Sequence, residues 1–148
     1  MSNLPQQEAM WYALSRGYSQ ARDALESALK SANLPALDVF DALNALVESE
    51  TQLTAKALET ALLMPQYGVS RLLDRMEKDG LVARVANPGD QRSKLLKVTQ
   101  SGAETHIRMK RVRDASLVDF FGPRARPGQL MRMTRLLGLL DDTADAAD

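Results

Sequence analysis

The side chains whose types and spacing most directly suggest chemistry are Asp90, Arg92 and Lys94, which share one short polar segment. Apolar runs rich in branched residues flank this segment at 81–85 and 95–98, and an Asn-Pro-Gly-Asp turn signal lies between the runs. The pattern predicts a β-hairpin with a charged tip. Such a tip suits an ordinary solvated loop, but a basic ribbon beside a helix also suits contact with a polyanion. The neighbouring elements have to decide between these interpretations.

A helix is predicted directly before the hairpin. Its apolar residues Val69, Leu72, Leu73 and Met76 recur at spacings of three and four, and Gly80 follows its end. Proline is favoured at the first helical position, so the helix is expected to begin at residue 65 or 66 and to run to 79. Its outward face carries polar side chains that bind base edges or phosphates, with two further cations toward one side. These residues are Gln66, Tyr67, Ser70, Arg71 and Asp74, with Arg75 and Lys78 beside them.

A short helix precedes this one and completes a familiar arrangement. Thr54 is a good N-cap for a helix over 55–61, and a turn of about three residues, 62–64, leads to Pro65. A short helix, a tight turn and a longer helix have the spacing of a helix-turn-helix. Alone, the polar face of the second helix would be best explained as ordinary solvated surface. Beside a basic hairpin, contact with nucleic acid is the better interpretation.

The remaining chain is predicted to be helical. We expect helices over 6–32, 36–47, about 102–121 and 129–140, separated by breaks at Asn33-Leu34-Pro35, Gly122-Pro123 and Pro127-Gly128. Thr99 or Ser101 would cap the helix after the hairpin, and Ser101 with Glu104 fits the capping-box spacing. The first helix is longer than is needed to cover one side of a small domain, which suggests contact with a second chain. The fold class is therefore mostly α with one β-hairpin.

Composition sets the broad class of the protein. The 148 residues fit one domain, and 45% hydrophobic and 26% charged residues are ordinary for a globular protein. The formal net charge is zero, but residues 66–113 hold eleven basic and five acidic side chains, whereas both flanks are net acidic. No membrane-length apolar run and no signal peptide are present, so we expect a cytoplasmic protein with no membrane partner.

Catalytic chemistry has no candidate residues. The chain has no cysteine, and His106 is the only histidine, so neither a metal site nor a nucleophilic triad is supported. A histidine at this position is most often a partly buried or surface residue of its helix. No glycine-rich phosphate loop is present. We therefore expect a protein that is not an enzyme and that needs no cofactor and no metal.

The segment from Leu53 to Gly102 resembles the winged helix-turn-helix core of the MarR family of bacterial transcription regulators. The resemblance rests on SRLLDRMEKDGLV at 70–82, on the wing motif DQRSKLLKVT at 90–99 and on the closing Gly102. The flanking helices match the layout of that family in outline, so the likeness covers nearly the whole chain. The expected organisation is one domain over 1–148, with a DNA-binding lobe at 36–100 and dimerisation helices within 1–33 and 101–148.

The resemblance implies a homodimer that binds double-stranded DNA at a pseudo-palindromic operator. The helix at 65–79 would enter the major groove, and the wing would reach the neighbouring minor groove. By position in the wing motif, Arg92 would insert there, with Asp90 holding it by an ion pair. The expected DNA-binding residues are Gln66, Tyr67, Ser70, Arg71, Arg75, Asp90, Arg92 and Lys94.

Family members commonly bind small, often aromatic or phenolic, effectors between the dimerisation helices and the DNA-binding lobe. The aromatic residues that would line such a pocket here are Trp11, Tyr12, Tyr18 and Phe40, although aromatic side chains on amphipathic helices are more often core. Leu63 stands where the family often has a turn glycine, Glu59 where it often has alanine, and Pro65 replaces the usual Ser or Thr cap.

Two functions of different class follow. The first is a homodimeric DNA-binding repressor that a small ligand releases. The second is a winged-helix protein-interaction module, or an anti-regulator, that does not bind DNA. Zero net charge and the acidic Asp74, Glu77 and Asp79 in or beside the reading helix favour the second. The concentrated basic charge of residues 66–113 favours the first.

Overall fold

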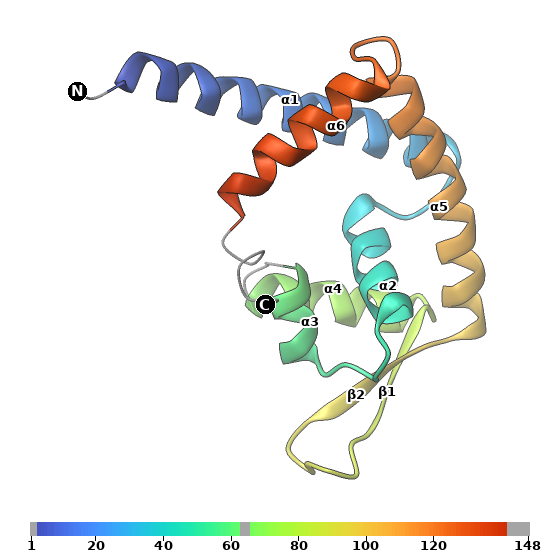
Figure 1. Ribbon diagram of the computed structural model, residues 1–148. Helices are drawn as coiled ribbons and strands as arrows, with labels where there is room; N and C mark the ends of the chain where they lie inside the picture. The colour runs from blue at the N-terminus through green and yellow to red at the C-terminus, as the bar shows by residue number, and fades with distance from the viewer. Residues whose placement is uncertain (1–2, 63–65, 142–148) are drawn as a thin grey trace.

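The computed structural model describes residues 3–62 and 66–141, and it is mostly helical with a single hairpin (Figure 1). The first helix and the last α-helix lie outside the central lobe, and the hairpin projects from the opposite end of the molecule. The expected fold class is confirmed. In chain order the elements are α1 Leu4–Ser31, α2 Leu37–Glu48, α3 Ala55–Leu62, α4 Gln66–Lys78, β1 Val82–Ala86, β2 Lys94–Val98, α5 Gln100–Phe121, α6 Pro127–Leu137 and a 3-10 turn, η1, Gly138–Leu140.

Most predicted boundaries lie within one or two residues of the observed ones, but the start of α5 differs in kind. Thr99 is the N-cap, and its Oγ1 accepts a hydrogen bond from the Gly102 amide at 3.0 Å. The helix therefore already includes Ser101, and the capping box predicted for Ser101 and Glu104 is wrong. Glu104 instead accepts from the side chain of Gln100. The expected helix over 129–140 begins earlier, at Pro127, and its last turn is 3-10.

The core lies where α2, α3 and α4 meet the first half of α5 and the end of α1. Its fully buried side chains include the apolar residues that the periodicity of α4 predicted. These fully buried residues are Leu29, Leu43, Leu58, Val69, Leu73, Met76 and Met109. Burial of one face of α4 leaves its opposite face exposed to solvent.

The wing is an antiparallel pair in which Val82 is opposite Val98 and Ala86 is opposite Lys94. The segment before α3 extends this small sheet, because the Leu96 amide donates to the Leu53 carbonyl at 2.8 Å. The polar tip between the strands is therefore held at a fixed distance from the start of α3. This pairing positions the wing beside the helix-turn-helix.

One junction joins α4, the wing and α5. Gly80 ends α4 with φ of 73°, a backbone conformation that favours glycine. Thr99 then donates its hydroxyl to the Gly80 carbonyl at 2.6 Å. Gly102 lies so close to this turn that a Cβ atom there would be 2.0 Å from the Leu81 carbonyl oxygen. The glycine of the wing motif is thus required by a close backbone approach.

The two ends of the described chain form arms that bury little. Only Leu25 and Leu29 of α1 are buried, both near its C-terminal end, and α6 buries none of its residues. In Figure 1 the first half of α1 projects away from the lobe formed by α2, α3 and α4. Large apolar side chains are exposed along both arms, among them Met10, Trp11, Tyr12, Tyr18, Met131, Met133, Leu136 and Leu139.

Candidate nucleic-acid interface

The exposed face of α4 carries the polar residues that the sequence predicted for it. Ser70, Arg71 and Asp74 are exposed on the face opposite the buried Val69 and Leu73. Gln66 and Tyr67 belong to the first turn of α4, but their side chains lie outside what the structure describes. The turn at 63–65, where the chain departs from the family pattern, also lies outside the described residues. The face is suited to contacts with base edges and phosphates.

A hollow of about 720 Å³ separates this helix from the wing, and α3 borders it on a third side. Four predicted residues meet on its wall, namely Ser70 from α4 and Asp90, Arg92 and Lys94 from the wing. Sequence reasoning missed Lys56 in the first turn of α3, which lines the same hollow and is exposed. The sequence contained a signal for Lys56, because a cation just after the predicted N-cap Thr54 lies at the exposed N-terminus of the first helix of the helix-turn-helix.

The carboxylate of Asp90 organises the wing tip in a different way from the predicted ion pair. Its Oδ1 accepts from the backbone amide of Arg92 at 2.9 Å, and no ion pair joins the two side chains. The expected ion pair is therefore corrected, because the short acid closes an Asx-type turn on the backbone. Asn87 supports the same tip by accepting from the Gly89 amide and donating to Ser93. The guanidinium of Arg92 is exposed and has no ion-pair partner among residues 3–62 and 66–141.

Arg84 of β1 neutralises two acids of α4. Its Nη2 lies 2.7 Å from Asp74 Oδ1, and its Nη1 pairs with Glu77 Oε2. The hydrogen bond that Arg84 donates to Asp74, and then the one that it donates to Glu77, raises the pKa of Arg84 further above its usual value. Sequence analysis did not assign Arg84 a role, since strand and helix are adjacent only in the fold. The pairing removes much of the acidic character of the exposed face of α4.

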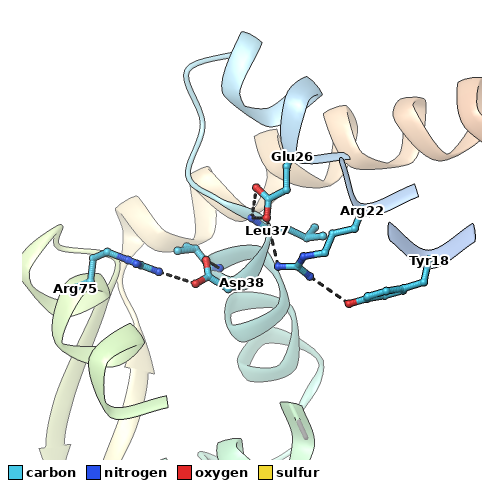
Figure 2. Close-up of polar contacts among 7 residues, drawn as sticks. Tyr18, Arg22, Glu26, Leu37, Asp38 and Arg75 are labelled. Atoms are coloured by element: carbon cyan, nitrogen blue, oxygen red, sulfur yellow. Dashed lines mark hydrogen bonds and ion pairs between the residues drawn. The ribbon is translucent and has the colours of Figure 1, made fainter. Parts of the chain in front are cut away.

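Arg75 differs from the other predicted DNA-binding cations because it is turned toward α2. Its Nη2 lies 2.7 Å from Asp38 Oδ2 in the first turn of α2 (Figure 2). Arg71, one helical turn earlier on α4, is exposed and has no ion-pair partner in the described part of the chain. The two arginines therefore have different surroundings despite lying on one helix.

The four aromatic residues predicted for an effector pocket are not gathered in one cavity of this chain. Phe40 is buried in the core, where it stacks on His106 with 5.4 Å between ring centroids and carries the Arg113 guanidinium over its ring at 5.0 Å. Trp11, Tyr12 and Tyr18 are exposed on α1. The Tyr18 hydroxyl accepts from Arg22 at 3.4 Å, as Figure 2 shows. The pocket stays a prediction.

Other kinds of site are not supported by the described residues. In residues 3–62 and 66–141, no three acidic, histidine or cysteine side chains are grouped as metal ligands would be. Over the same ranges, none of the helices combines the length and apolar character that crossing a bilayer requires.

Comparison with known proteins tests the family resemblance. The sequence model of the MarR family matches residues 33–93, from the loop before α2 to the tip of the wing. The resemblance to the MarR family is confirmed. The match includes α2, α3, α4 and β1 and leaves α1, β2, α5 and α6 outside it. No curated protein matches the chain at a significant level.

Solved structures extend the likeness to the arms. AbsC, a MarR family transcriptional regulator from Streptomyces coelicolor, has 22% identity and a TM-score of 0.83 over 99% of this chain and 97% of that one. Sco3205 of the same organism, a MarR family regulator solved in complex with DNA, has 19% identity and a TM-score of 0.82 over 95% and 87%. BpsR of Bordetella bronchiseptica has 21% identity and a TM-score of 0.79 over 88% and 91%, and its DNA binding is regulated by 6-hydroxynicotinic acid. The chain thus has the MarR-type fold from end to end.

Proposed function

We propose that this protein is a homodimeric, sequence-specific DNA-binding transcriptional regulator, and more specifically a repressor that a small ligand releases. The observation that carries the proposal is the hollow between α4 and the wing. Three cations from α3 and the wing line it, namely Lys56, Arg92 and Lys94, together with the acids Glu59 and Asp90. A concave surface with convergent cations suits a polyphosphate backbone. Sco3205, which shares the fold, was solved with DNA.

In the proposed complex, α4 enters the major groove and the wing follows the backbone to the next minor groove. Ser70 and Arg71 would meet base edges and phosphates, with Gln66 and Tyr67 at the start of the same helix. Arg92 would enter the minor groove, where a narrow groove has an enhanced negative potential. Because Asp90 holds the backbone of the tip and leaves the Arg92 guanidinium unpaired, the arginine needs no ion pair to be broken before it binds.

The proposed dimer is supported by the arms. Large apolar side chains are exposed on α6 and on the first half of α1, and the described residues of this chain do not bury them. An apolar hollow of about 600 Å³ at the corner between α5 and α6 offers a surface for burying them, lined by Leu117, Phe121 and Leu130 among others. Two copies would then present two α4 helices to successive half-sites of a pseudo-palindrome, about 34–36 Å apart.

The alternative of a protein-interaction module is weakened by the ion pairs of Arg84. Two of the acids that favoured it, Asp74 and Glu77, are neutralised by this residue of the wing. The zero net charge also hides an uneven distribution, since the excess of basic residues lies in residues 66–113, which form α4, the wing and the first part of α5. A titration with DNA separates the two functions directly.

The deciding experiment is a fluorescence-anisotropy titration of the full chain with the DNA upstream of its own gene, at two salt concentrations. Wild-type protein should bind with an affinity that falls steeply with salt, and an unrelated duplex should bind more weakly. Arg92→Ala should weaken operator binding at least about tenfold, leave the dimer intact and lower the salt slope by about one. The two variants of β2 provide matched controls: Lys94→Ala lies on the wall of the hollow, whereas Lys97→Ala alters an exposed lysine outside it.

The outcomes separate the parts of the proposal. Absence of salt-dependent binding by the wild type would contradict DNA recognition. Unchanged affinity of Arg92→Ala would reject the wing assignment alone. Equal losses in Lys94→Ala and Lys97→Ala would show that binding follows total charge and not the hollow between α4 and the wing.

The ligand and the sign of regulation have their own test. A thermal-shift screen with phenolic and other small aromatic acids should find a compound that raises the melting temperature, because a ligand that binds only the folded state stabilises it. The same compound should lower operator affinity in the anisotropy assay. A compound that raises operator affinity instead would contradict release of a repressor.

A further inference from the structure

The start of α2 lacks a capping side chain of its own and is held by two acids. Ala36 is the N-cap residue and offers no side-chain acceptor. Glu26 of α1 supplies one, with its Oε1 and Oε2 at 3.3 and 3.2 Å from the Leu37 amide (Figure 2). Unpaired amides at a helix start favour a nearby carboxylate. The first turn of α2 is thus fixed to α1.

Asp38, the second acid, uses its two oxygens in different directions. Oδ1 accepts from the Val39 amide at 2.8 Å, within the first turn of α2. Oδ2 accepts from Arg75 Nη2 at 2.7 Å, which joins α2 to the second half of α4. Val39 and Phe40, which follow directly, are buried in the core. The backbone of α2 therefore holds the Asp38 carboxylate through Oδ1, and Oδ2 is left to bind Arg75 of α4.

The sequence predicted a different role for Arg75, as a DNA contact. Its side chain is 52% exposed while that of Asp38 is 30% exposed, so solvent reaches the pair. Arg71 provides the natural comparison, because it lies four residues earlier on the same helix and is exposed without an ion-pair partner in the described ranges. One helix thus holds one tethered and one free arginine.

We propose that Asp38 and Arg75 form a latch that sets the position of α4 against α2, so that Arg75 is a positioning residue and not a DNA contact. The inference rests on the proposed function, because it names how the reading helix is held for DNA. The buried face of α4 fixes which side faces the core, and the latch adds a polar contact outside that face. It resists a rolling or tilting of α4 about its apolar contacts.

The latch and a direct DNA contact predict opposite effects for Asp38→Asn. The substitution keeps an oxygen for the Val39 amide, removes a negative charge near the DNA surface and frees Arg75. If Arg75 binds phosphate, all three features maintain or strengthen DNA binding. If the pair positions α4, affinity falls although the protein has become more positive. Solvent-exposed ion pairs change equilibria modestly, so we expect a loss of about two- to fivefold per protomer.

The experiment compares operator affinity and its salt slope in wild type, Asp38→Asn, Arg75→Gln and the double variant. The latch predicts equal losses in both single variants, no further loss in the double variant and an unchanged salt slope in Arg75→Gln. Arg71→Gln should lower the slope by about one, as expected for a phosphate contact. Glu48→Gln, which removes an exposed acid at the other end of α2, controls for the change in charge.

A second measurement uses the free protein and does not depend on DNA. Asp38→Asn and Arg75→Gln should speed amide hydrogen exchange in α4 relative to α3, whereas Glu48→Gln should not. Tighter or unchanged DNA binding by Asp38→Asn, a reduced salt slope in Arg75→Gln or unaltered exchange in α4 would each overturn the latch. If the wild type binds no DNA, the proposed function fails, and the exchange experiment still decides whether the latch holds α4.

Discussion

The lobe of this molecule buries its large apolar side chains, whereas the arms leave theirs exposed. In the lobe, α2, α3, α4 and the first half of α5 enclose side chains such as Leu43, Leu73 and Met109, which are fully buried. In the arms, α6 buries nothing and the first half of α1 leaves Trp11 and Tyr12 exposed. The lobe therefore has a complete core within one chain, whereas the arms do not.

This difference shows which part of the molecule can form a complete core from a single chain. The family model matches the part of the lobe from residue 33 to residue 93, and the solved structures match the arms as well. Large apolar residues cost free energy when water covers them, by about 25 cal/mol per Å². An arm with such a surface is expected to be stable only against another surface of the same kind, which supports the proposed homodimer.

Removal of one arm should have the largest effect. A chain that ends before Arg126 loses α6 and the apolar residues of the 3-10 turn while keeping the whole lobe. We expect it to be monomeric and to bind the operator at least about a hundredfold more weakly, because two linked half-sites lose their avidity. Light scattering gives the mass, and circular dichroism shows whether the lobe remains folded. A dimer of the truncated chain would place the dimer contact elsewhere.

Two single leucine substitutions should distinguish the lobe from the arms, with smaller effects than the truncation. Leu73→Ala in the lobe removes a side chain that is 0% exposed and should cost about 2–5 kcal/mol of unfolding free energy. Leu136→Ala in α6 alters a side chain that is 62% exposed, so within one chain it should cost almost nothing. In a dimer it should weaken association. Urea denaturation at two protein concentrations separates these effects.

The two variants should differ in concentration dependence and not only in size. The loss in Leu73→Ala should be similar at both concentrations, whereas that in Leu136→Ala should grow on dilution. A Leu136→Ala protein that matches the wild type at every concentration would mean that this part of α6 is not at the interface. The comparison between lobe and arms would then apply to α1 alone.

The sequence predicted most of the lobe because its signals are local. Period, glycine stops and turn residues placed α4, β1 and β2 to within one or two residues. Ser70, Arg92 and Lys94 were predicted as DNA-binding residues, and all three line one hollow. Each of these predictions needed only the spacing of neighbouring residues.

Predictions that depend on partners distant in the sequence were less successful. Asp38 and Arg75 are 37 positions apart, so nothing local indicated that this arginine faces α2. The role of Arg84 was missed for the same reason, since β1 reaches Asp74 only after the chain has turned. The Asp90–Arg92 ion pair was wrong because a short acid reaches a nearby backbone amide more easily than a long side chain. The effector residues remain a prediction, because Phe40 is core while the other three are exposed.

The smallest predicted effect lies within the lobe, at His106 of α5. This buried side chain stacks on Phe40, and its Nε2 lies 3.0 Å from Asn44 Oδ1 of α2. Burial lowers the pKa of His106 below its ordinary value, and nearby Lys110 adds to this, while Glu48 opposes it. The unfolded chain therefore binds a proton at a higher pH than the folded chain does.

Stability should accordingly fall as the pH drops below about 6.5, the ordinary histidine value in an unfolded chain, and the loss should level off below the folded pKa. Each unit by which the pKa is lowered corresponds to about 1.4 kcal/mol. His106 is the only histidine, so urea denaturation of wild type and His106→Gln between pH 7.5 and 5.5 isolates its contribution. Burial raises the pKa of Asp41, and its contribution is common to both proteins. The same slope in both proteins would show that His106 is protonated in the folded chain without a cost in stability, and that the contact between α2 and α5 tolerates the charge.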